Sequence, residues 1–211
     1  MFAGENGLQG DPRLQAISDS IRVVPHFPKP GERRTAPLRP DDVPVFLPGI
    51  MFQDITTLLL NPKVFKDVID IFVDRYKDMR VTVVAGIEAR GFLFGPAVAL
   101  AIGAKFVPLR KPRKLPGEVI WENYELEYGT DRLEMHVGAV GVGDRAVIMD
   151  DLVATGGTLC AAMKLVERVG GEVVECACVI GLPRFKGKCK LNGKPLYILV
   201  EPRKFQCCLK P

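Results

Sequence analysis

The stretch formed by residues 146–158 constrains the fold of this chain more than any other segment. It starts with the apolar run 146–149, continues with the carboxylates Asp150 and Asp151, and ends in a Gly-rich turn that opens a helix at about Gly157. Such a turn directs successive backbone N–H groups into one concavity, at a helix N-terminus whose dipole favours anions. The turn therefore predicts a phosphate site. The carboxylates beside it predict binding of hydroxyls or a metal, so the whole segment suits a phosphorylated sugar.

Two other phosphate-binding motifs do not fit the chain. A Walker loop needs Lys and then Ser or Thr after its last glycine, whereas Gly157 is followed by Thr158 and Leu159. Residues 141–146 spell the dinucleotide-type pattern G-x-G-x-x-A. That fingerprint must follow a strand and open a helix. Here it precedes a predicted strand, so we interpret it as a turn.

The composition narrows the class of protein. The chain has 211 residues, which predicts one domain, and its 29 Lys and Arg against 25 Asp and Glu give a net charge of only +4. Because no concentrated basic patch is visible, we do not expect nucleic acid as a partner. Serine occurs only at Ser18 and Ser20, which argues against a serine hydrolase, and 2 histidines are too few for a His-rich metal centre.

Cysteine usage and hydropathy bear on the compartment. The 6 cysteines form no C-x-x-C pair, and Cys176 and Cys178 lie in an apolar run, where free cysteine behaves as a small hydrophobe. This favours reduced cysteines, without a disulfide framework or a zinc site. Residues 1–7 lack the features of a signal peptide, and the longest apolar run, residues 91–104, is too short to span a bilayer. We therefore expect a cytoplasmic protein with no membrane partner.

Apolar spacing predicts an alternation of strands and helices. Helices are expected to start at Pro12 and Pro62, and apolar residues at helical spacing carry the first of them as far as Val24. Further helices are predicted over residues 92–102 and 158–169, and strands over residues 81–85, 106–109, 146–149, 173–180 and 196–200. This alternation predicts an α/β fold with a mainly parallel twisted sheet flanked by helices.

Three predicted loops are expected to meet in one crevice. Ligands of open parallel sheets bind beyond the carboxyl ends of the strands. Residues 88–90, 110–114 and 150–158 each follow a predicted strand. Residues 111–123 hold Lys, Arg, Pro and Gly with little periodicity, and we interpret them as a mobile loop.

Two other irregular regions are visible, together with a hairpin. Residues 124–128 and 133–137 predict a hairpin that turns around residues 129–131. Residues 32–49 are rich in Pro and Arg and have no period, and we expect them to lie within a single domain formed by residues 1–211. The tail, residues 203–211, is expected to be disordered.

Four segments carry a resemblance to a known family. They read Asp-Asp-Leu-Val-Ala-Thr-Gly-Gly-Thr at 150–158, Ala-Gly-Ile-Glu-Ala-Arg-Gly-Phe-Leu-Phe-Gly-Pro at 85–96, Arg-Lys-Pro-Arg-Lys-Leu-Pro-Gly at 110–117 and Tyr-Glu-Leu-Glu-Tyr-Gly at 124–129. The first resembles the signature of type I phosphoribosyltransferases, which bind 5-phosphoribosyl-1-diphosphate. The other three resemble segments of the adenine-using members. The resemblance covers most of the chain, and it implies that family's fold with a small hood and a flexible loop. It also implies that residues 32–49 are a loop insertion, which a surface loop absorbs at modest entropic cost.

The resemblance also implies a reaction, in which adenine and 5-phosphoribosyl-1-diphosphate give AMP and diphosphate in purine salvage. Asp150 and Asp151 would bind the ribose hydroxyls, and their charge favours the oxocarbenium character that develops as the bond at C1 breaks. The cradle of the 5′-phosphate would comprise Ala154, Thr155, Gly156, Gly157 and Thr158. The cations that face the diphosphate would be Arg90, Arg110, Lys111 and Lys114.

Further roles follow from the same resemblance. A cis peptide bond is implied between Glu88 and Ala89, where it would expose N–H groups to diphosphate. Mg²⁺ is expected to bridge the diphosphate oxygens, held mainly by diphosphate and ribose rather than by a protein metal site. A homodimer is usual in this family.

The base is expected to lie in an apolar slot. The segment that matches the adenine-contacting residues of the family comprises Met51, Phe52 and Gln53. Phe52 would stack on the base, and Leu152 would close the other face. Glu127 matches a residue proposed to handle a base proton, and Tyr128 would close with the loop to exclude water from C1.

Several alternatives stay open at this point. The first is a phosphoribosyltransferase that uses another base, namely hypoxanthine, guanine, orotate or uracil. The segment around Phe52 argues against this, and the neighbouring 32–49 insertion weakens that argument. A non-catalytic regulator that binds 5-phosphoribosyl-1-diphosphate is a second alternative, although no DNA-binding domain is visible. A sugar-phosphate or nucleotide hydrolase on the same anion turn is a third, although no supporting nucleophile or metal cluster is visible.

Overall fold

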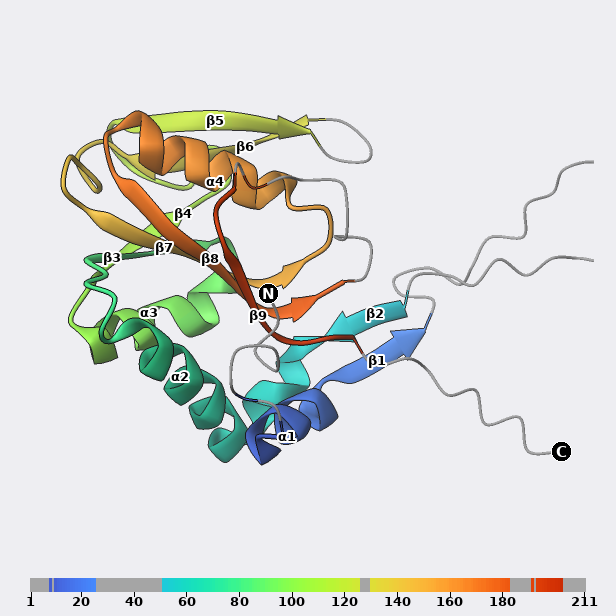
Figure 1. Cartoon of the computed structure of the whole chain (residues 1–211). Helices are drawn as coiled ribbons and strands as arrows, with labels where there is room; N and C mark the ends of the chain where they lie inside the picture. The colour runs from blue at the N-terminus through green and yellow to red at the C-terminus, as the bar shows by residue number, and fades with distance from the viewer. Residues whose placement is uncertain are drawn as a thin grey trace, which may run out of the picture.

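The structure is a computed structural model that describes residues 8, 10–25, 51–125, 130–182, 191 and 193–202. Its centre is a sheet of five parallel strands in the order β4-β3-β7-β8-β9 (Figure 1). These strands are β3 (Val83–Ile87), β4 (Lys105–Leu109), β7 (Arg145–Val153), β8 (Glu172–Gly181) and β9 (Leu196–Val200). The predicted α/β fold with a mainly parallel sheet is therefore confirmed.

Helices cover both faces of this sheet. Three of them, α1 (Pro12–Ser20), α2 (Pro62–Tyr76) and α3 (Gly91–Ile102), share one buried apolar cluster, and α4 (Gly157–Arg168) lies in a second cluster. Figure 1 shows α2 and α3 below the sheet and α4 above it. The apolar run of β7 supplies both clusters, because successive side chains of a strand point to opposite faces. Met149 packs with the first cluster and Ile148 with the second.

Side-chain caps explain where two helices start. The Asp11 carboxylate accepts a hydrogen bond from the backbone N–H of Arg13 at 2.8 Å, and the Asn61 side chain accepts from the first turn of α2. Both predicted starts are confirmed. The predicted extension of the first helix to Val24 was wrong, because Val24 lies in β1 (Arg22–Pro25). A distant partner decides this, since β1 pairs antiparallel with β2 (Met51–Asp54), which leads into the 3₁₀ helix η2 (Ile55–Leu60).

The predicted hairpin exists but has other limits. It consists of β5 (Val119–Glu125) and β6 (Thr130–His136), while residues 126–129 lie outside the described part. The interpretation of 119–123 as loop was therefore wrong, and so was a turn that includes Thr130. Glu122 interrupts the apolar alternation of β5, and its carboxylate lies 3.4 Å from Lys164 and 3.3 Å from Arg168 on α4. Because a charged residue occupies an inward-facing position, this strand lacks the regular alternation of apolar and polar residues that identifies a strand in a sequence.

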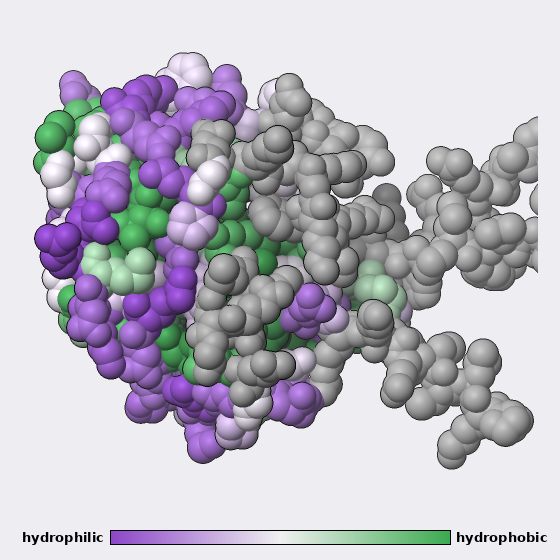
Figure 2. Space-filling model, in the orientation of Figure 1, coloured by the Kyte–Doolittle hydropathy of each residue, from purple (hydrophilic) through white to green (hydrophobic). Residues whose placement is uncertain are grey.

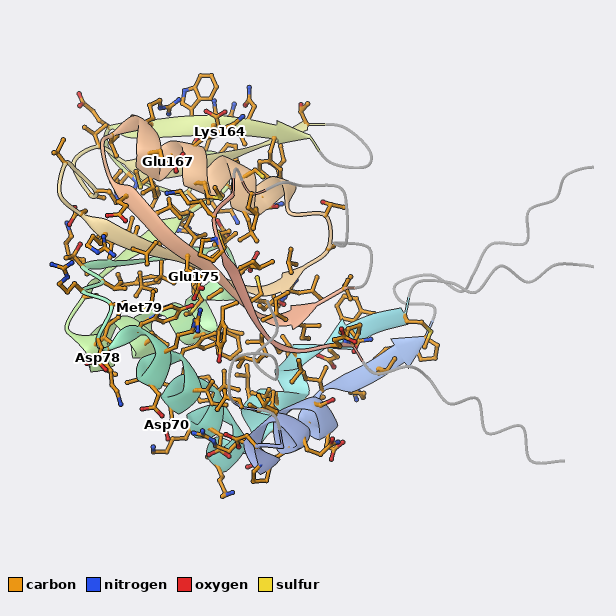
Figure 3. All side chains as sticks on the ribbon, viewed as in Figure 1. Asp70, Asp78, Met79, Lys164, Glu167 and Glu175 are labelled. Atoms are coloured by element: carbon orange, nitrogen blue, oxygen red, sulfur yellow. The ribbon has the colours of Figure 1, made fainter. Side chains whose placement is uncertain are left out.

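A buried ion pair joins α2 to the sheet. Glu175 on β8 is 1% exposed, and its carboxylate accepts hydrogen bonds from Arg75 at 2.5 and 2.6 Å and from the Tyr76 hydroxyl at 2.9 Å. The Arg75 guanidinium also lies 4.0 Å from the centre of the Tyr197 ring on β9. Figure 3 shows Glu175 between the sheet and α2. The network fixes α2 against two strands.

Other expectations concern the surface and the cysteines. On the face drawn in Figure 2, polar residues cover the upper and lower margins and apolar residues are visible between them. Among the helices that the structure describes, none combines the length and apolar character needed to cross a membrane. Cys176 and Cys178 are free and buried, as expected, but Cys160 is disulfide-bonded, so the expectation of a reduced cysteine was wrong at that position. The 32–49 insertion and the 203–211 tail lie outside the described residues.

Candidate active site

Three loops follow the carboxyl ends of the neighbouring strands β4, β3 and β7 and border one cavity of about 610 Å³. The predicted site residues that line it are Glu88, Ala89, Arg90, Lys111, Lys114, Asp150, Asp151, Leu152, Ala154, Thr155, Gly156 and Thr158. Lining residues that sequence reasoning did not assign are Ile87, Tyr124, Val153 and Leu159. The expected convergence of the three loops is therefore present.

Two helix N-termini face this cavity, and they differ from the others in how they are capped. Asp11, Asp54 and Asn61 cap α1, η2 and α2 with their side chains. In the described part of the chain, neither α3, which starts after Arg90, nor α4, which starts after Gly156, has a side-chain cap. The first N–H groups of a helix have no partner within the helix, and they bind anions well. An anionic ligand is the natural cap for these two helices.

The acidic pair lies inside β7 rather than after it. The strand runs to Val153, so the predicted end at Met149 was wrong, and Asp150 and Asp151 point to opposite sides of the sheet. Asp151 is 4% exposed and lies on the side of α3, where its carboxylate accepts from Arg90 Nε at 2.5 Å. Asp150 is partly buried, and its carboxylate accepts from the backbone N–H of Asp151 at 2.9 Å. Both still reach the cavity because the strand ends there.

The environment of Asp150 disfavours its charge. Burial raises the pKa of this carboxyl well above its ordinary value, and the negative charge of Asp151 raises it further. Arg90 lowers the pKa of Asp150, but by less than the other two effects raise it. An ionised Asp150 is therefore costly in the ligand-free protein, and a ligand that donates hydroxyl groups or brings positive charge would relieve this cost.

Glu88 gathers the cations on the other side of the cavity. Its carboxylate accepts from Lys114 Nζ at 2.6 Å, from the backbone N–H of Lys111 at 3.0 Å and from Arg110 Nε at 3.3 Å. Burial raises the pKa of Glu88, but these hydrogen bonds outweigh burial and lower the pKa to about 2. The peptide bond between Glu88 and Ala89 is cis, as the resemblance implied. Arg110 is not among the lining residues, because its guanidinium is turned to Glu88 and to the backbone oxygen of Lys114.

A further carboxylate, Asp131, stands behind the wall of the cavity. Its Oδ2 atom lies 3.0 Å from Lys111 Nζ and accepts from the Tyr124 hydroxyl at 3.1 Å. Burial and the charge of Asp131 raise the pKa of Tyr124 to about 12, so this phenol stays protonated. Tyr124 and Asp131 are directly opposite each other on β5 and β6. Sequence reasoning missed both, because their relation depends on the register of the hairpin.

Other predicted residues lie elsewhere or outside the described part. Met51, Phe52 and Gln53 lie on β2 in the small antiparallel sheet, and they do not border the cavity of about 610 Å³. Gly157 borders a neighbouring hollow of about 420 Å³ rather than the main cavity. Glu127 and Tyr128 fall among residues 126–129, outside the described residues. Within the described residues, no group of three or more His, Cys, Asp or Glu is arranged to hold a metal.

Close packing places the start of α3 against the acidic strand, which leads to a first prediction. A Cβ atom on Gly91 would lie 2.5 Å from the backbone oxygen of Met149 and 3.4 Å from Cα of Asp150. Gly91→Ala is expected to destabilise the protein by about 1–3 kcal/mol, since backbone must move, and to lower activity because Arg90 moves with it. Chemical denaturation and steady-state kinetics measure both effects.

Gly141→Ala is the matched control, because a Cβ atom there meets nothing within 4 Å. This control should leave stability and kinetics near the wild type. Equal behaviour of the two variants would contradict the role assigned to the close approach at Gly91.

Comparisons with known proteins agree with this geometry. The family model of the phosphoribosyl transferase domain matches residues 54–195. The chain is similar to adenine phosphoribosyltransferase 2 of Arabidopsis thaliana, with 68% identity over 205 residues that cover 97% of each chain. It is also 47% identical over 191 residues to the adenine phosphoribosyltransferase of Serratia proteamaculans, covering 90% of this chain and 87% of that protein.

Solved structures give the same result. The adenine phosphoribosyltransferase of Saccharomyces cerevisiae, complexed with adenine and an imino-altritol bisphosphate, has a TM-score of 0.76 and 35% identity, covering 90% of this chain and 99% of that chain. The Trypanosoma brucei enzyme, in complex with AMP, pyrophosphate and ribose-5-phosphate, has a TM-score of 0.76 and 29% identity, covering 96% of this chain and 86% of that chain. From the fold, the cavity and these similarities, the chain belongs to the adenine phosphoribosyltransferases of the phosphoribosyl transferase family.

Proposed function

We propose that the cavity bordered by Glu88–Arg90, Lys111, Lys114 and residues 150–158 converts adenine and 5-phosphoribosyl-1-diphosphate to AMP and diphosphate. One observation carries this proposal. Two helix N-termini that have no side-chain cap in the described chain face one cavity, and this cavity is lined by cationic side chains as well as by an acidic pair. The donor molecule has a phosphate at one end of its ribose and a diphosphate at the other. It therefore offers an anion to each helix and hydroxyls to the carboxylates between them.

The N-terminus of α4 is the proposed cradle of the 5′-phosphate. Thr155, Gly156 and Thr158 line the cavity at this helix end, and two of them add hydroxyl donors. Asp150 and Asp151 are the proposed acceptors of the ribose hydroxyls. Positive charge develops on the ribose as the bond from C1 to diphosphate breaks, and two carboxylates held nearby favour that charge.

The diphosphate is proposed to lie between α3 and the loop after β4. Arg90, Lys111 and Lys114 line this side, and the ligand would compete with Asp151 for the charge of Arg90 and with Glu88 for the charge of Lys114. Because the described residues offer two adjacent carboxylates at the cavity and no larger group of metal ligands, Mg²⁺ fits only as an ion held largely by the ligand's own oxygens. When bound there, it would neutralise the charge of the leaving diphosphate.

The base site, the proton transfer and the assembly are proposed from the resemblance. Met51, Phe52 and Gln53 are the proposed adenine contacts, with Leu152 on the opposite face; Glu127 and Tyr128 keep the roles given above. A cytoplasmic homodimer is proposed as well.

A base panel tests the proposed function. Purified protein is incubated with Mg²⁺, 5-phosphoribosyl-1-diphosphate and one of adenine, hypoxanthine, guanine, orotate or uracil, and diphosphate release is measured. We expect release with adenine alone. Release with a different base would contradict the assignment of adenine, binding of the donor without turnover would indicate a regulator, and donor breakdown without any base would indicate a hydrolase.

A further inference from the structure

Asp131 contacts the cavity wall from behind. Lys111 and Tyr124 line the cavity, whereas Asp131 is absent from the lining residues that the structure describes. Both wall groups bind the same carboxylate oxygen of Asp131, Lys111 at 3.0 Å and Tyr124 at 3.1 Å. The other carboxylate oxygen accepts from the backbone N–H of Arg132 at 2.8 Å. One carboxylate thus fixes two side chains that come from different elements.

The contacts extend across the cavity. Lys111 belongs to the loop after β4, and Tyr124 and Asp131 are cross-strand partners in the β5–β6 hairpin. Tyr124 packs against the apolar cluster under α4, and it lines the cavity together with Thr158, in the first turn of that helix. The diphosphate side and the 5′-phosphate side of the cavity are therefore connected through Asp131.

Fixing Lys111 in advance matters because the side chain is long. Lys111 is 51% exposed, so without a partner its ammonium group samples many positions. Holding a lysine side chain in one geometry costs about 1.5–2 kcal/mol of rotamer entropy. A pre-formed contact with Asp131 removes part of this cost from donor binding.

We propose that Asp131 is a positioning residue that holds Lys111 and Tyr124 at the cavity wall for binding of 5-phosphoribosyl-1-diphosphate. This inference rests on the proposed function. It assigns Asp131 no contact with the substrate. Its effect is on affinity for the donor, through the two residues that it binds, and not on the bond-breaking step.

Asp131→Ala tests the proposal in the full chain. We expect the KM for 5-phosphoribosyl-1-diphosphate to rise about tenfold while kcat stays within about twofold of the wild type. Asp131→Asn should restore part of the affinity, because its amide oxygen still accepts a hydrogen bond. In a double-mutant cycle, Asp131→Ala should have a smaller effect in the Lys111→Met background than in the wild type, since part of its effect passes through that lysine.

Glu122→Ala is the matched control. Glu122 lies on β5 of the same hairpin and also pairs with cations, Lys164 and Arg168, but it does not line the cavity. We expect its KM to stay unchanged. An unchanged or lowered KM in Asp131→Ala, the same rise in Glu122→Ala, or full additivity with Lys111→Met would each overturn the proposal. Wild-type protein without adenine-dependent turnover would instead contradict the proposed function.

Discussion

Asp150→Asn is expected to lower kcat/KM for 5-phosphoribosyl-1-diphosphate by about 10²–10³-fold, because the change removes a charge aimed at the developing oxocarbenium ion. The same change is expected to raise the thermal stability of the ligand-free protein. Burial and the adjacent Asp151 disfavour the ionised form of Asp150, and Asn carries no charge. The hydrogen bond from the backbone N–H of Asp151 survives, since the amide oxygen can replace Oδ1. Scanning calorimetry and steady-state kinetics measure the two effects.

The stability gain should depend on pH in a defined direction. The pKa of Asp150 is raised in the folded protein above its ordinary value of 3.8. A group of this kind binds more protons folded than unfolded, so wild-type stability falls as pH rises from about 4 through the raised pKa. Asn does not titrate. The advantage of Asp150→Asn should therefore be absent below about pH 4 and complete above the folded pKa, and a pH-independent difference would contradict this explanation.

Asp151→Asn is the matched comparison at the neighbouring position. Activity should again fall strongly, but the protein should become less stable, by about 1 kcal/mol after solvent screening of the half-exposed Arg90. The reason is that Asp151 pairs with Arg90 Nε at 2.5 Å. Activity near wild type in either variant would remove the catalytic role of that carboxylate. Stability changes of the same sign in both variants would show that their surroundings do not differ as described.

Glu175→Ala is expected to produce the largest loss of stability, about 3 kcal/mol, since removing one partner of a buried ion pair leaves the other uncompensated. Arg75 would lose both hydrogen bonds, and the buried Tyr76 hydroxyl would lose its acceptor. The expected loss lies at the lower end of the range known for removing one partner of a buried ion pair, because the Arg75 side chain is 26% exposed. Chemical denaturation followed by circular dichroism measures the change. Kinetics at a temperature where the variant is folded should stay near wild type, because Glu175 is near the start of β8, away from the cavity.

Asp74→Ala provides the control on the same helix. Asp74 pairs with Lys77 at 2.9 Å, but both side chains are more than half exposed, at 57% and 53%. Exposed pairs of this kind contribute little to stability, because water and salt screen the two charges. If Glu175→Ala lost no more stability than Asp74→Ala, the buried network would not hold α2 to the sheet as its contacts indicate.

The sequence by itself determined the order and type of most elements. Helix starts at Asp11 and Asn61 depend on side chains that cap the next few N–H groups, so the signal lies within four residues. The β9 strand was predicted at residues 196–200, its observed limits, because a strand covered on both faces is a continuous apolar run. The anion turn at Gly156 was also recognisable, since it forms the start of a helix and its signal lies in neighbouring residues.

Only the tertiary structure decided relations between distant segments. It placed Asp150 and Asp151 on opposite faces of β7, because the strand continues as long as β8 pairs with it. It brought Asp131 to Lys111, and that contact depends on the hairpin register. Pairing with β2 also places Val24 in the strand β1 instead of in the first helix. Local sequence limits what each segment can form. Which side chains meet depends on pairing between strands far apart in the chain, and no local pattern contains that information.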